Sequence, residues 1–133
     1  MAPQCGLCRA EMVGFVIPES IVEFAPAQGT FASLCRVCLT LEVHETAIEV
    51  DEPLSVISAA FPDDETEAAM IAILVGLLDS LALHRRAIQA VVFELESVGV
   101  DALLVLDRLI DDSSLRPAID LDRRVYQLGQ LLE

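Results

Sequence analysis

Cys5-Gly6-Leu7-Cys8 and Cys35-Arg36-Val37-Cys38 decide the fold, and together they contain all four cysteines of the chain. A gap of two residues lets both sulfurs of a pair turn toward one point. Two such pairs complete the tetrahedron that Zn²⁺ adopts in structural sites. The sequence therefore predicts a small zinc ribbon whose metal ligands are Cys5, Cys8, Cys35 and Cys38.

Two other chemistries use cysteines at this spacing. A thioredoxin-like dithiol motif follows a buried strand, and only four residues precede Cys5. A disulfide framework belongs to oxidising compartments, and the residues before Cys5 do not resemble a secretory signal. We favour structural zinc and keep a redox protein using Cys5 and Cys8 as an alternative. Four thiolates fill the coordination sphere, so we expect no catalytic role for the metal.

Three side chains near the cysteines are relevant to the metal site. Arg9 and Arg36 each directly follow a cysteine; either their guanidinium groups offset thiolate charge and donate hydrogen bonds to sulfur, or both are simply exposed side chains. His44 follows Cys38 by six residues, but the four cysteines leave no need for it as a ligand.

The charge is strongly one-sided, with 22 acidic residues against 8 basic ones and a net charge of −14 in 133 residues. Every basic residue is arginine, and there is no lysine. This bias resembles that of extremely halophilic archaea, where molar salt shortens the Debye length to about 3 Å and screens carboxylate repulsion. A basic face for nucleic acid is missing, so we expect a protein partner. A nucleic-acid-associated factor using Arg9 and Arg36 is kept as the first alternative.

Short strands are predicted in the first part, residues 1–50, at 12–17, 30–34 and 41–50. Residues 20–24 fit either a strand or one turn of helix. Such short segments bury little apolar surface, so metal binding would supply much of their folding free energy.

Helices are predicted in the second part, residues 53–133. Proline at 53 opens a short helix to residue 60. A heptad pattern then predicts one long helix over residues 64–98, ended by Gly99. Asp101 and Asp120 are expected to cap two further helices, ending near residues 111 and 132. The whole is an α+β fold: a β zinc ribbon followed by a helical hairpin or bundle with one long helix.

The long helix carries several further expectations. Residues 68–78 contain no polar side chain, but they are shorter than the roughly 20 residues of a membrane span, so we expect a buried helix and no membrane partner. Ala68, Ala72 and Gly76 form a small-residue stripe where another helix can approach. His84 falls at a heptad core position and is expected to be buried. The apolar heptad face is a candidate homodimer surface, made of Met70, Leu74, Leu77, Leu81, Ile88 and Leu95.

Catalytic motifs are missing from the sequence. It contains no phosphate-binding or dinucleotide-binding glycine pattern, no His-Glu-x-x-His and no Gly-x-Ser-x-Gly. We therefore expect a non-enzymatic adaptor or regulatory protein with no catalytic or cofactor-binding residues besides the zinc ligands. Arg85-Arg86 and Arg123-Arg124 are expected to form ion pairs at helix ends rather than an anion site.

The paired cysteines, the missing lysine and the helical second part resemble the small CPxCG-related zinc-finger proteins of haloarchaea. Three segments resemble an uncharacterised family of that group: Leu78-Asp79-Ser80-Leu81-Ala82, Gly99-Val100-Asp101 and Asp120-Leu121-Asp122-Arg123-Arg124. This resemblance covers essentially the whole chain. The first pair departs from the label, with Gly6 where proline is typical and Arg9 where glycine is typical. The resemblance implies zinc binding and a cytoplasmic location, and it implies no activity.

Overall fold

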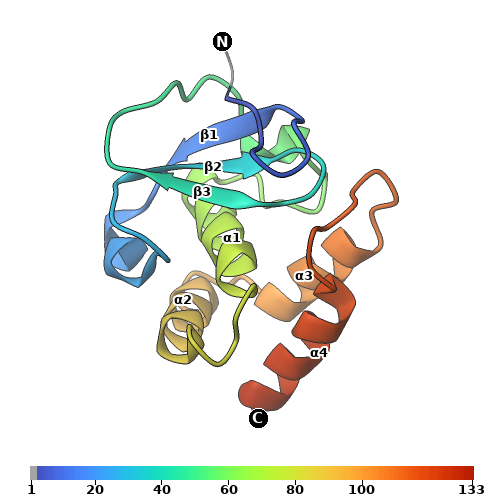
Figure 1. Ribbon diagram of the computed structural model, residues 1–133. Helices are drawn as coiled ribbons and strands as arrows, with labels where there is room; N and C mark the ends of the chain where they lie inside the picture. Colours follow the sequence, from blue (N-terminus) through green and yellow to red (C-terminus); the bar gives the residue numbers. More distant parts are fainter. Residues whose placement is uncertain (1–2) are drawn as a thin grey trace.

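The computed structural model describes residues 3–133 and has a small sheet above a group of helices (Figure 1). In chain order its elements are β1 (Met12–Val16), η1 (Glu19–Phe24), β2 (Phe31–Cys35), β3 (Leu41–His44), η2 (Leu54–Val56), α1 (Glu65–Leu77), α2 (Arg85–Ser97), α3 (Ala102–Ile110) and α4 (Leu121–Leu131). The predicted α+β class is confirmed.

The sheet is antiparallel, with strand order β1-β2-β3. Met12 of β1 lies opposite Cys35 of β2, and Phe31 at the other end of β2 lies opposite His44 of β3. The first two predicted strands are confirmed within a residue. The third was predicted to reach residue 50 but ends at His44. Residues 48–49 instead lie against β1. They are so close to Gly14 that a Cβ there would come within 2.3 Å of the Glu49 carbonyl oxygen.

Two short 3₁₀ helices, η1 and η2, occupy residues 19–24 and 54–56. Residues 20–24, which fitted a strand or a helical turn, belong to η1, which begins directly after Pro18. The helix predicted over residues 53–60 is reduced to the three residues of η2. Proline at 53 is placed as expected, directly before the helical turn.

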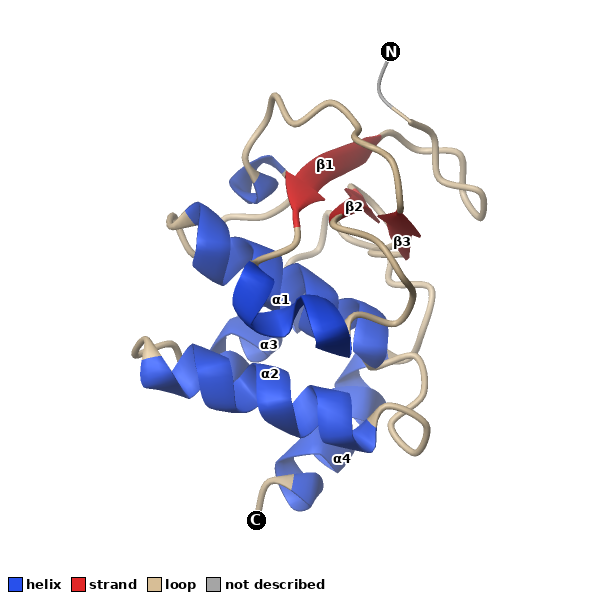
Figure 2. Ribbon diagram, turned by 90° about the vertical axis from the view of Figure 1, so that its left-hand side faces the viewer, coloured by secondary structure: helices blue, strands red, loops and turns tan. Residues whose placement is uncertain are grey.

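The single long helix predicted over residues 64–98 is wrong, because residues 78–84 separate α1 from α2. Ser80 takes part in the break: its carbonyl accepts from the N–H of His84 at 3.0 Å and its hydroxyl from the N–H of Leu83 at 3.4 Å. The break lets α2 fold back beside α1 (Figure 2). His84 is consequently a partly exposed residue at the start of α2, with Nε2 3.4 Å from Asp79 Oδ1, and not a core residue.

The caps predicted at Asp101 and Asp120 are confirmed, and Asp64 caps α1 in the same way. The side chains of Asp64, Asp101 and Asp120 each accept a hydrogen bond from the backbone N–H three residues ahead. Gly99 follows α2 with a φ of 84°, the left-handed conformation expected of a helix-ending glycine.

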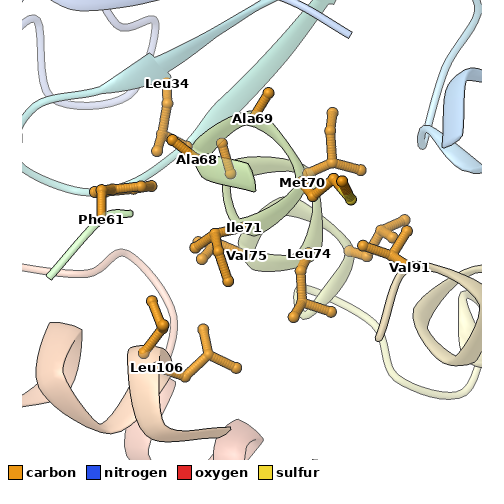
Figure 3. Packing of buried hydrophobic residues seen from close by; sticks show 14 of the residues in the cluster. Leu34, Phe61, Ala68, Ala69, Met70, Ile71, Leu74, Val75, Val91 and Leu106 are labelled. Carbon is orange, nitrogen blue, oxygen red and sulfur yellow. The ribbon is translucent and has the colours of Figure 1, made fainter. Parts of the chain in front are cut away.

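Helix α1 is the centre of the molecule and is buried on most of its circumference, as predicted. In Figure 3, Ala68 lies beside Leu34 of β2, Leu74 lies on the side of Val91 of α2, and Ile71 faces the side of Leu106 of α3. One continuous hydrophobic cluster contains residues of the sheet and of these helices, so the predicted boundary at residues 50–53 does not divide the core. The division into units 1–50 and 53–133 stays a prediction.

The small-residue stripe of α1 faces the sheet and not another helix at Gly76. A Cβ there would lie 2.3 Å from Leu41 Cδ2 of β3, so glycine permits the close approach of helix and strand. The proposed dimer face is covered within the chain, because Met70, Leu74 and Leu77 are at most 2% exposed. Whether the protein forms a homodimer stays a prediction. None of the helices within residues 3–133 has the length and apolar character needed to cross a bilayer.

Candidate metal centre

The four predicted ligands come together, with all sulfur atoms within 4.8 Å of one another. Two separations between the pairs are 3.6 Å from Cys5 Sγ to Cys38 Sγ and 3.4 Å from Cys8 Sγ to Cys35 Sγ. Zinc–sulfur bonds of about 2.3 Å give a tetrahedron with edges of about 3.8 Å. A disulfide would need about 2.05 Å. The cage therefore fits a tetrahedral metal ion.

Both cysteine pairs are folded by the same hydrogen bonds. In each, the N–H of the first cysteine donates to the carbonyl five residues ahead: Cys5 to Ala10 at 2.8 Å and Cys35 to Thr40 at 3.0 Å. This bond closes the loop and turns the pair of sulfurs inward. Because the two loops are built alike, we call them the first and the second knuckle, residues 5–10 and 35–40.

Backbone amides also point at the sulfurs. Leu7 N lies 3.3 Å from Cys5 Sγ, and Val37 N lies 3.4 Å from Cys35 Sγ, so the third residue of each knuckle donates to the first sulfur. In the second knuckle the Thr40 hydroxyl lies 3.0 Å from Cys38 Sγ. These donors stabilise thiolate charge and orient the ligands. The role of Thr40 was not predicted, and its position two residues after a cysteine was the available signal.

The residue after each second cysteine has a positive φ, 66° at Arg9 and 62° at Leu39. These are the only residues other than glycine within 3–133 with this conformation. It costs about 1–2 kcal/mol for a residue with a Cβ. The same strained turn therefore recurs at the equivalent position of both knuckles. A glycine at either position would adopt this conformation without that cost.

Of the two alternatives for the arginines, a hydrogen bond to sulfur is not formed by Arg36. Its guanidinium group lies 2.5 Å from a Glu52 carboxylate oxygen and 3.7 Å from one of Glu11, and it donates to no sulfur. Arg9 is exposed and likewise donates to no sulfur among the described residues. His44 is engaged elsewhere, with Nε2 2.9 Å from the hydroxyl of buried Ser33. The field around the sulfurs thus comes mainly from backbone N–H groups.

Burial and ionisation differ among the ligands. Cys5, Cys35 and Cys38 are buried, whereas Cys8 is exposed, so one corner of the cage meets solvent. Burial raises the pKa of Cys35 to about 12 and also raises that of Cys38. Burial opposes ionisation of Cys5 too, but backbone N–H groups of Cys8 and Leu7 outweigh it and lower the pKa to about 7. Metal binding must therefore displace protons from Cys35 and Cys38.

The second knuckle is also tied to the segment that leads into α4. Arg116 N–H donates to the Val37 carbonyl at 2.7 Å, and Ala118 N–H donates to the Cys38 carbonyl at 3.0 Å. Sequence reasoning missed this link, because no local pattern joins residues separated by almost 80 positions. It connects the metal centre directly to the helical part.

Comparisons with curated proteins and with solved structures found no significant match. A family model matches residues 4–132, a span that contains both knuckles and every helix of the structure. Its description is a family of unknown function, DUF6276. The chain belongs to this uncharacterised family, whose extent coincides with the sheet, the cysteine cage and the helices together.

Proposed function

We propose that the protein is a non-enzymatic adaptor or regulatory protein whose fold is held by one structural Zn²⁺. The observation that carries the proposal is the convergence of Cys5, Cys8, Cys35 and Cys38 at tetrahedral spacing. Zinc suits four thiolates in this geometry, and such a site is coordinatively full. Its contribution is then stability and shape, not chemistry on a substrate.

Two features favour a protein partner over nucleic acid. The net charge of −14 repels a phosphate backbone, and Arg36 is committed to Glu11 and Glu52, which leaves Arg9 alone on the knuckles. Leu7 is 67% exposed beside Arg9 at the end of the first knuckle and offers an apolar contact. Aromatic side chains Phe93 and Tyr126 are similarly exposed on α2 and α4.

The dithiol alternative is less well supported. Cys5 Sγ and Cys8 Sγ each lie within 3.6 Å of a sulfur of the second knuckle, as ligands of a shared metal do, whereas redox chemistry by one Cys-x-x-Cys motif needs a disulfide within the motif. Cys5, the thiol with the lowered pKa, is 1% exposed, so a substrate disulfide would not reach it.

We further propose a haloarchaeal, cytoplasmic protein of the CPxCG-related type. The acidic, lysine-free composition supports this. So does the left-handed turn at Arg9, which is the geometry that the glycine of that pattern supplies.

A pull-down at about 1 M KCl or above, where repulsion between carboxylates is screened, tests the adaptor role. Tagged wild type is compared with and without nuclease, and metal is measured in the same preparation. We expect protein partners that survive nuclease and a zinc-loaded bait. Partners lost on nuclease treatment would favour the nucleic-acid alternative. A metal-free bait with a Cys5–Cys8 disulfide would favour the dithiol alternative.

A further inference from the structure

Three of the eight basic residues gather where the start of α2 approaches α4. Residues of the 81–85 segment and of α4 together line a hollow of about 510 Å³ that includes Arg85 and Arg124. A second hollow of about 280 Å³ adjoins it and includes Arg123, and both share Arg124 and Gln127. We call these two hollows the arginine surface.

The arginines of this surface have no acidic partners. Within residues 3–133, the only arginine with a carboxylate oxygen within 4.0 Å is Arg36. The ion pairs expected for Arg85, Arg123 and Arg124 are therefore not formed, although the chain has 22 acidic residues. Asp120, which also lines the smaller hollow, uses its carboxylate to cap the backbone N–H of Arg123.

The placement of these arginines is unfavourable for the isolated chain. Arg85 begins α2, and Arg123 and Arg124 lie in the first turn of α4, which also carries Asp122. The helix dipole is positive at this end, so cations there lose stability where anions would gain it. Grouping like charges adds further repulsion. A bound anionic group would reverse both effects.

The surroundings indicate which anion fits. Leu81 and Leu131 line the larger hollow with Arg85 and Arg124, and Leu83, two residues after Leu81, is 76% exposed. Guanidinium groups pair with carboxylates in a planar, two-point fashion, and the leucines would cover apolar side chains between them. A long polyanion such as nucleic acid would also meet the rest of a surface with net charge −14. A short segment meets only the local field.

We propose that the arginine surface docks a short, acidic, leucine-bearing segment of a partner protein. The inference deepens the proposed function and rests on it, since it names the class of partner that the adaptor takes. The segment places carboxylates on Arg85 and Arg124 and its apolar side chains on Leu81 and Leu131.

Fluorescence anisotropy with a labelled twelve-residue peptide of alternating glutamate and leucine tests this, at the lowest KCl concentration that keeps the protein folded. The double variant Arg85→Gln/Arg124→Gln should weaken binding by about tenfold or more, because two charge-assisted contacts are lost. The matched control Arg108→Gln/Arg116→Gln removes the same charge from exposed positions outside the surface and should weaken it less than about twofold.

Three results would overturn the inference: no peptide binding by folded, metal-loaded wild type, equal weakening in both double variants, or tighter binding of single-stranded DNA of equal charge. A wild-type dimer that Arg85→Gln/Arg124→Gln dissociates in sedimentation would also overturn it, since a second copy would then be the occupant. None of these variants replaces a cysteine. If the peptide does not bind although zinc is present, the docking inference fails while the structural zinc of the proposed function stands.

Discussion

Gly76→Ala tests the junction between the sheet and α1 most sharply. In an ordinary helix, replacing glycine with alanine stabilises by about 1 kcal/mol. At Gly76 the new Cβ would lie 2.3 Å from Leu41 Cδ2 and 2.8 Å from Leu41 Cβ. Rotating the leucine side chain removes the first overlap but not the second, because its Cβ is fixed to the backbone of β3. The strand must move, and overpacking of this kind costs about 1–3 kcal/mol.

Gly129→Ala is the matched control, because Gly129 also lies near the end of a helix and nothing would come within 4 Å of its Cβ. We expect it to raise the free energy of unfolding by about 0.5–1 kcal/mol. Gly76→Ala should leave the protein unchanged or lower this free energy by up to about 2 kcal/mol. Denaturant unfolding followed by circular dichroism at constant KCl measures both. If Gly76→Ala is as stable as Gly129→Ala, β3 does not lie on α1 as described.

Three further predictions follow from the metal centre and the charge. Cys35→Ser should lose the bound metal and also lower the unfolding midpoint of the helices, because carbonyls of the second knuckle hold residues 116–118. Metal analysis and circular dichroism measure the two effects, and unchanged melting of the helices would contradict the prediction. Arg9→Gly should stabilise by up to about 1 kcal/mol in denaturant unfolding, whereas Arg9→Ala, which keeps the strained turn, should not. Thermal midpoints should rise steeply between about 0.1 and 1 M KCl, as the Debye length falls from about 10 to 3 Å; a flat series would refute a salt requirement.

The metal ligands could be predicted from sequence because their geometry is local. Two residues between cysteines place both sulfurs on one turn, and two such turns need only an antiparallel pairing to meet. Met12 opposite Cys35 supplies that pairing. The starts of the capped helices could be predicted for the same reason, since a capping aspartate accepts a hydrogen bond from an N–H only three residues away.

The break between α1 and α2 could not be found from periodicity. The connection spans residues 78–84, which is seven residues and one full heptad, so the apolar repeat continues in phase on its far side. Asp79 and Ser80 were the signal, because both side chains compete for backbone hydrogen bonds. Partners fixed by tertiary structure were also beyond reach, among them the carboxylates around Arg36 and the link from Val37 to Arg116.

Native mass spectrometry of freshly purified wild type tests the central claim most directly. It weighs the folded chain with its metal, and a denaturing spectrum of the same sample reports the oxidation state of the four cysteines. We expect one Zn²⁺ per chain and four reduced thiols after denaturation. A metal-free chain, with Cys5 and Cys8 joined in a disulfide, would contradict it.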